Sequence, residues 1–119
     1  NLKNILGHSD IAPERKKDPG EKFPWQYLSQ NKVGLWHSIK KQELIKNRKI
    51  KTTKIDKGLF IDNLFKIGYQ KKIFRALDEN KYLNFIIKAF QRRYRQVLIN
   101  GKIDQECLII SKNLIQKFY

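Results

Sequence analysis

The chain of 119 residues has no methionine, one cysteine, three prolines and only 11 acidic residues. A lone cysteine cannot form an intrachain disulfide, so cysteine usage does not indicate a redox compartment. Cys107 precedes Leu108, Ile109 and Ile110 in a helical pattern, which predicts a buried structural thiol rather than a nucleophile. No apolar run is long enough to cross a bilayer, so no membrane span is expected.

Positive charge is abundant instead, because 26 Lys and Arg residues give a formal net charge of +15. Residues 1–37 carry a net charge of +2, residues 38–58 of +6 and residues 59–119 of +7. Clustered cations attract nucleic acids and other anionic polymers. Most of the cations are lysines, and isoleucine and asparagine are also abundant, as A+T-rich codons would produce. The charge therefore favours contact with an anionic polymer and does not by itself predict a nucleic-acid partner.

The shifts in composition predict three regions, at residues 1–37, 38–58 and 59–119. The middle region is expected to be a basic linker with a short helix in its first half and an extended second half. The last region is expected to be a small module of three helices. The first predicted helix covers residues 59–68. The second is expected to begin after an N-cap at Asn80, and the third after an N-cap at Asp104.

The first region begins with an apolar run at residues 2–6, which predicts a buried strand. Pro13 and Pro19 then impose a loop, and Pro24 starts a helix expected to end at Gly34.

This loop contains an imidazole, an ammonium and a carboxylate, on His8, Lys16 and Asp18. Neutral imidazole and carboxylate are both zinc ligands. An ammonium can stabilise negative charge on a carbonyl oxygen under attack by metal-activated water. The residue types are therefore compatible with a zinc hydrolase, although a lone histidine before a polar loop is more often a structural or surface residue than a metal ligand.

A family resemblance is carried by residues 7–20, GHSDIAPERKKDPG, followed by FPW at 23–25 and VGLW at 33–36. This segment closely resembles the end of the catalytic domain of zinc-dependent N-acetylmuramoyl-L-alanine amidases. The resemblance implies that His8 and Asp18 are two of three protein ligands to Zn²⁺ and that Lys16 is catalytic. The implied reaction is hydrolysis of the amide between N-acetylmuramic acid and L-alanine of the stem peptide.

The same resemblance implies that the chain begins inside a domain, with the remaining zinc ligand and a catalytic carboxylate upstream. The expected fold is thus an α/β remnant of a zinc amidase domain, incomplete in this chain, followed by an all-α three-helix domain. We expect the chain alone to be inactive and the upstream part to be its partner.

Neighbouring residues allow other assignments. Asp10 is expected to brace the loop rather than bind metal, and Arg15 and Lys17 to face solvent or substrate. His37 leaves open a self-contained site with His8 and Asp18. No nucleophile-elbow pattern surrounds any serine, which argues against a Ser-His-Asp triad.

A second resemblance is carried by AFQRRYR at residues 89–95 and LINGKID at 98–104. These segments resemble the peptidoglycan-binding domain found beside many wall hydrolases, although the usual Thr after the Asp is replaced near Glu106 and Cys107. The implied partner is peptidoglycan or a muropeptide, and the implied location is the bacterial cell envelope or periplasm, with the cytoplasm as the alternative.

Three alternative functions remain open for the helical module. It could be a docking domain that binds nothing, or the chain could be a non-catalytic wall-binding module. The third alternative is a nucleic-acid binder that uses Arg92, Arg93, Tyr94 and Arg95, although no nucleic-acid partner is expected.

Overall fold

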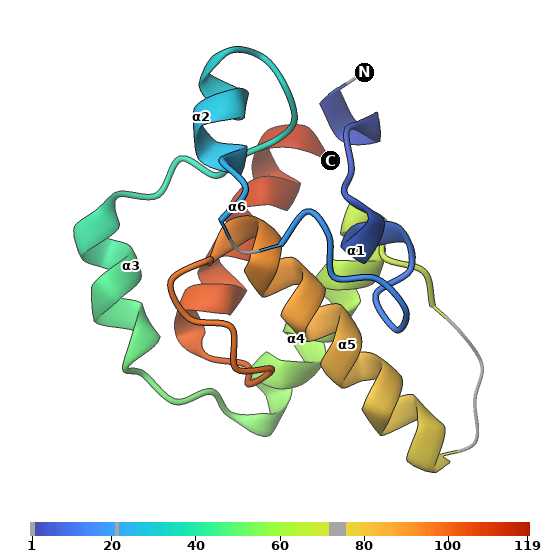
Figure 1. Cartoon of the computed structure of the whole chain (residues 1–119). Helices are drawn as coiled ribbons and strands as arrows, with labels where there is room; N and C mark the ends of the chain where they lie inside the picture. The colour runs from blue at the N-terminus through green and yellow to red at the C-terminus, as the bar shows by residue number, and fades with distance from the viewer. Residues whose placement is uncertain (1, 21, 72–75) are drawn as a thin grey trace.

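The computed structural model describes residues 2–20, 22–71 and 76–119, and within them the chain is helical (Figure 1). No helix in these ranges is both long and apolar enough to cross a membrane. The elements are the short 3-10 helix η1 (Leu2–Asn4) and the helices α1 (His8–Ile11), α2 (Trp25–Gln30), α3 (Lys41–Arg48), α4 (Lys54–Ile67), α5 (Ala76–Tyr94) and α6 (Gln105–Phe118).

The predicted α/β remnant is wrong. In the described ranges the only strand-like pairing is an isolated bridge between Lys51 and Asp104. Residues 2–4, expected in a strand, form η1, and residues 5–7 continue as loop. A strand is stable only when neighbouring strands take up its backbone hydrogen bonds, and the described part of the chain offers none.

Local signals in the sequence fix the ends of α4 and α6. Thr53 and Asp56 form a capping box at the start of α4, with both bonds at 3.1 Å. Gly68 ends α4 with φ of 126°, a conformation that L side chains rarely adopt. The Asp104 carboxylate caps α6 by accepting from the Cys107 N–H at 2.9 Å. The predicted end at Gly68 and start at Asp104 are confirmed, whereas α4 begins five residues earlier than expected.

Helix α5 begins at Ala76, so Asn80 lies inside it and the predicted N-cap is wrong. Asp78 and Glu79 occupy its first turn, where their charge complements the helix dipole. Similarly, α2 ends at Gln30 and not at the expected Gly34.

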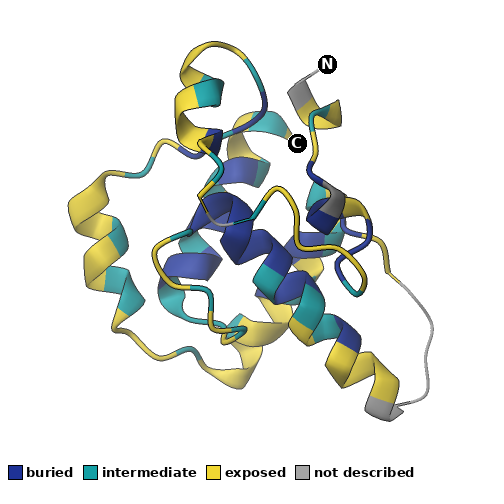
Figure 2. Cartoon of the chain, in the orientation of Figure 1, coloured by how far each residue is buried: buried dark blue, intermediate teal, exposed yellow. Residues whose placement is uncertain are grey.

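The core lies between α4, α5 and α6. Phe60 of α4 meets Phe90 of α5 edge-on, with ring centroids 5.1 Å apart. Cys107 is fully buried in this cluster, and burial raises the pKa of its thiol to about 12, so the predicted structural thiol is confirmed. Figure 2 shows burial concentrated on α6, on the carboxyl-terminal half of α5 and on α1. Fully buried members of the core include Phe60, Leu64, Ile86, Phe90, Ile110 and Leu114.

The region 38–58 contains α3, as expected for its first half, and α3 packs on α6. Two long-range hydrogen bonds fasten its second half: Gln105 N–H donates to the Ile50 carbonyl at 3.3 Å, and Thr52 Oγ1 to the Ile103 carbonyl at 3.0 Å. At the opposite side of the molecule, the Lys3 ammonium lies 4.4 Å from the centroid of the Tyr119 ring, so the two ends of the chain are neighbours. The boundaries at residues 37 and 58 remain predictions.

Candidate metal centre

The loop of residues 7–20 is closed by backbone contacts between its two ends. The Ser9 N–H donates to the Asp18 carbonyl at 3.0 Å. A Cβ at Gly7 would lie 2.5 Å from Cδ of Pro19, so only glycine allows this approach. These contacts place the backbone of His8 beside that of Asp18, although nine residues separate them.

The residues predicted to react lie on this loop. His8 is the first residue of α1, but its side chain is outside the described part of the structure. Asp18 and Lys16 are exposed. Among the described side chains no group of three or more His, Cys, Asp or Glu could hold a metal. The imidazole and carboxylate donors fit zinc, and with their backbones adjacent they can supply two of its ligands. The assignment of His8, Asp18 and Lys16 remains a prediction.

Asp10 braces the loop, as expected. Its Oδ2 accepts from the Gly7 N–H at 3.0 Å and from Nη1 of Arg93 at 3.1 Å, and its Oδ1 accepts from the Tyr69 hydroxyl at 2.6 Å. Burial and the Asp10 carboxylate hold the pKa of Tyr69 well above its ordinary value, so Tyr69 stays a neutral donor. Asp10 is therefore tied to Arg93 of α5 and to Tyr69, which lies two residues after the end of α4.

Arg93 reaches from α5 into the region 1–37. Its guanidinium lies 3.8 Å from the ring centroid of Trp25, and a Cβ at Gly34 would lie 3.1 Å from its Nη2. The Arg93 side chain is 3% exposed and that of Asp10 is 5% exposed. A cavity of about 250 Å³ borders the pair and is also lined by Tyr69, Tyr94 and Tyr119. The spacing of Arg93, three residues after Phe90 and seven after Ile86, puts it on the buried face, which is the signal that sequence reasoning missed.

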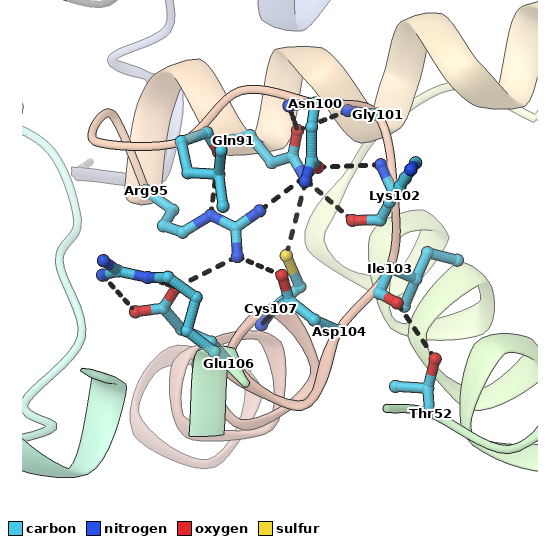
Figure 3. A network of polar contacts seen from close by, with 12 residues as sticks. Thr52, Gln91, Arg95, Asn100, Gly101, Lys102, Ile103, Asp104, Glu106 and Cys107 are labelled. Atoms are coloured by element: carbon cyan, nitrogen blue, oxygen red, sulfur yellow. Dashed lines mark hydrogen bonds and ion pairs between the residues drawn. The ribbon is translucent and has the colours of Figure 1, made fainter. Parts of the chain in front are cut away.

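A second buried polar network organises the turn between α5 and α6 (Figure 3). The Gln91 carboxamide oxygen accepts from the backbone N–H groups of Asn100 and Gly101 at 3.0 and 2.9 Å. The Gln91 amide nitrogen donates to the Lys102 carbonyl at 2.9 Å. The Gln91 side chain therefore supplies hydrogen-bond partners to three backbone groups of this turn.

Next to this turn, the fully buried Glu106 accepts from two arginines. Arg48 of α3 donates to both carboxylate oxygens at 2.8 and 2.9 Å, and Arg95 donates to one of them at 3.0 Å. Arg95 also bonds Asp104. The network fastens α3 to the start of α6.

His37 lies in a different setting from the loop. Its side chain is buried, its Nδ1 accepts from the Ile39 N–H at 3.3 Å, and its Nε2 has no partner among the described residues. Burial lowers the pKa of His37 to about 4, against the raising effect of the Glu106 carboxylate. The cavity that His37 lines includes Leu44 of α3 but none of residues 7–20. The structure does not bring His37 to Asp18.

The basic residues that favoured a nucleic-acid binder do not form an exposed patch. Arg92, Arg93, Tyr94 and Arg95 are all buried, and Arg93 and Arg95 are held by carboxylates inside the molecule. The charges of Arg93 and Arg95 are therefore used for internal contacts.

No protein-family model matches the sequence. Over 115 residues, 97% of its length, the chain is 34% identical to the N-acetylmuramoyl-L-alanine amidase AmiD of Escherichia coli (strain K12), of which it covers 41%. A stretch of 22 residues, 18% of the chain, is 77% identical to the 1,6-anhydro-N-acetylmuramyl-L-alanine amidase AmpD of Enterobacter cloacae, of which it covers 12%.

Comparison with solved structures also finds N-acetylmuramoyl-L-alanine amidases and related proteins. The chain superposes on AmiD from E. coli, in complex with the substrate anhydro-N-acetylmuramic acid-L-Ala-D-gamma-Glu-L-Lys, with a TM-score of 0.80 and 33% identity over 99% of the chain and 45% of AmiD. It superposes on AmpDh3 from Pseudomonas aeruginosa, in complex with an anhydromuramic pentapeptide, with a TM-score of 0.78 and 28% identity over the same shares. The chain therefore spans less than half the length of these relatives. The similarity supports the resemblance to peptidoglycan amidases.

Proposed function

We propose that this chain is part of a peptidoglycan amidase that hydrolyses the amide between N-acetylmuramic acid and L-alanine. The observation that carries the proposal is the closure of the loop at Gly7, Ser9, Asp18 and Pro19, which puts the backbone of one predicted zinc ligand beside that of the other. The muropeptides in the AmiD and AmpDh3 complexes support the choice of substrate.

In this proposal His8 and Asp18 bind Zn²⁺, and a third ligand comes from a part of the protein outside this chain. Bound zinc would supply a Lewis acid and activate water for attack on the amide carbonyl. Lys16, whose side chain is exposed on the same loop, would stabilise the negative charge that develops on the carbonyl oxygen.

Metal content tests the ligands. The complete protein should bind about one zinc per site, and His8→Ala or Asp18→Ala should lose both zinc and amidase activity. Lys16→Ala should keep the zinc while turnover falls, and Lys22→Ala, a change of an exposed lysine just outside the loop, is the matched control. Stoichiometric zinc retained in both ligand variants would refute the assignment.

The need for an upstream part can be tested with the same substrate. The 119-residue chain, incubated with zinc and a muropeptide, should release no free stem peptide, because two ligands leave the metal site incomplete. Joining it to the segment that completes the relatives' length should restore release. Robust hydrolysis by the chain alone would show a self-contained site.

We further propose that the helical module, together with the preceding region 38–58, binds peptidoglycan and locates the protein in the cell envelope. A groove of about 650 Å³ runs between the connection from α3 to α4 and the turn from α5 to α6. Exposed lysines line it: Lys49, Lys51, Lys57 and Lys102. Their charge suits the carboxylates of stem peptides, and the attraction should weaken with salt.

Sedimentation with purified peptidoglycan tests this binding. The chain should sediment with the polymer at low salt, and replacing Lys49, Lys51 and Lys102 together by glutamine should release it. The matched control removes the same charge from exposed positions outside the groove, Lys46, Lys66 and Lys81. Equal loss in both triple variants would mean that net charge and not the groove is responsible, and no sedimentation of the unmodified chain would leave a docking role only.

A further inference from the structure

The buried carboxylate of Asp10 joins two parts of the chain that are far apart in sequence. It receives one bond from within its own loop, from the Gly7 N–H, and two from the helical module, from Tyr69 and Arg93. The Asp10 N–H also donates to the Gly7 carbonyl at 3.1 Å. Asp10 therefore bonds both the N–H and the carbonyl of Gly7 and closes the turn that contains His8. Asp10 is itself held by Tyr69 and Arg93, which lie outside the loop.

Arg93 has little freedom to move away from this position. Trp25 covers one face of its guanidinium at 3.8 Å, and the lack of a side chain at Gly34 makes room for its Nη2. Asp10 is the partner carboxylate of this buried cation. Removal of either charge would leave the other buried and uncompensated, which the folded chain tolerates poorly.

We propose that Arg93 and Tyr69 are positioning residues for the metal-binding loop, so that the helical module sets the backbone geometry in which His8 and Asp18 meet Zn²⁺. For the identity of the metal site this inference rests on the proposed function. The helical module would then serve the catalytic site directly, besides any binding to the wall. A purely structural pair would stabilise the fold without changing the local order of residues 7–18.

Amide hydrogen exchange of the 119-residue chain tests the positioning without any metal. Tyr69→Phe removes one hydroxyl and Arg93→Met removes the guanidinium, and each should raise the exchange rate of the Gly7 and Ser9 amides roughly tenfold or more. The control is Arg48→Met, which breaks the contact with Glu106 far from the loop. Protection of the Cys107 N–H, which donates to the capping carboxylate of Asp104 at the start of α6, reports whether the core stays folded. Unchanged exchange at Gly7 and Ser9 in a folded Tyr69→Phe variant would overturn the proposal.

The zinc affinity of the complete protein gives the second readout. It is measured by letting the protein compete with a chromophoric chelator for added zinc, without substrate. Arg93→Met should weaken zinc binding by about 10- to 100-fold, and Arg93→Lys should recover part of the loss. Arg48→Met should bind zinc as the unmodified protein does. Equal zinc affinity in Arg93→Met and the unmodified protein would overturn the positioning role, whereas an unmodified protein without zinc would refute the proposed metal site itself.

Discussion

Replacing Glu106 by alanine should destabilise the fold strongly, because this carboxylate is the shared partner of two arginines. It is fully buried and accepts three charge-assisted hydrogen bonds, two from Arg48 and one from Arg95. The Arg95 side chain is 2% exposed, whereas that of Arg48 is 28% exposed and can turn towards water. Glu106→Ala therefore leaves mainly the buried Arg95 with one carboxylate partner fewer, and Asp104 remains as its partner.

Breaking a buried ion pair by removing one partner costs about 3–5 kcal/mol. Since Asp104 still neutralises Arg95, we expect the lower end, about 3 kcal/mol. With a urea slope of about 1.5 kcal/mol per M, the midpoint of unfolding should fall by roughly 2 M. Arg48→Met leaves Glu106 paired with the buried Arg95 and should cost about 1–2 kcal/mol. The difference in unfolding free energy between Glu106→Ala and Arg48→Met measures the cost of leaving the buried Arg95 without the Glu106 carboxylate.

Urea unfolding followed by circular dichroism checks both values, and an unchanged slope confirms that the comparison concerns stability alone. A double-mutant cycle with Arg48→Met and Glu106→Ala should give a coupling of about 1 kcal/mol, as expected for groups in contact. The reasoning is refuted if Glu106→Ala costs less than about 1 kcal/mol, or no more than Arg48→Met, because a buried cation would then carry no penalty.

Three further changes probe single features. Gln91→Leu should cost about 3 kcal/mol in urea unfolding, because the N–H groups of Asn100 and Gly101 lose their buried acceptor; a neutral result would contradict this. As pH falls from 6.5 to 4, unfolded His37 takes up a proton that folded His37 refuses, so stability should fall by up to about 1.4 kcal/mol per pH unit. This slope should be missing in His37→Gln, and its persistence would point to other groups. Gly7→Ala should cost about 1–3 kcal/mol and speed amide exchange at Ser9, since the new Cβ meets Pro19; unchanged exchange would show that the loop adapts freely.

The loop illustrates how far sequence reasoning reached. The spacing of Asp10 from His8 suggested a brace, and the carboxylate does accept the Gly7 N–H within the same turn. That bond spans three residues, so a local pattern could predict it. The other two donors to Asp10 come from residues 59 and 83 positions away, and no local pattern specifies such partners.

The sequence by itself determined the parts of the fold that depend on neighbouring residues. The glycine after α4, the aspartate before α6 and the apolar stripes of the core helices act within a few residues of the chain, so their outcome follows from local hydrogen bonding and periodicity. Residues 2–6 show the limit, because their apolar run suits a strand only where partner strands exist, and in the described chain they contain η1 and loop. Helical spacing could have placed Arg93 on the buried face, but tertiary structure alone decided that Arg93 pairs with Asp10 and that Arg48 reaches Glu106, since the partners of these charges come from distant segments of the chain.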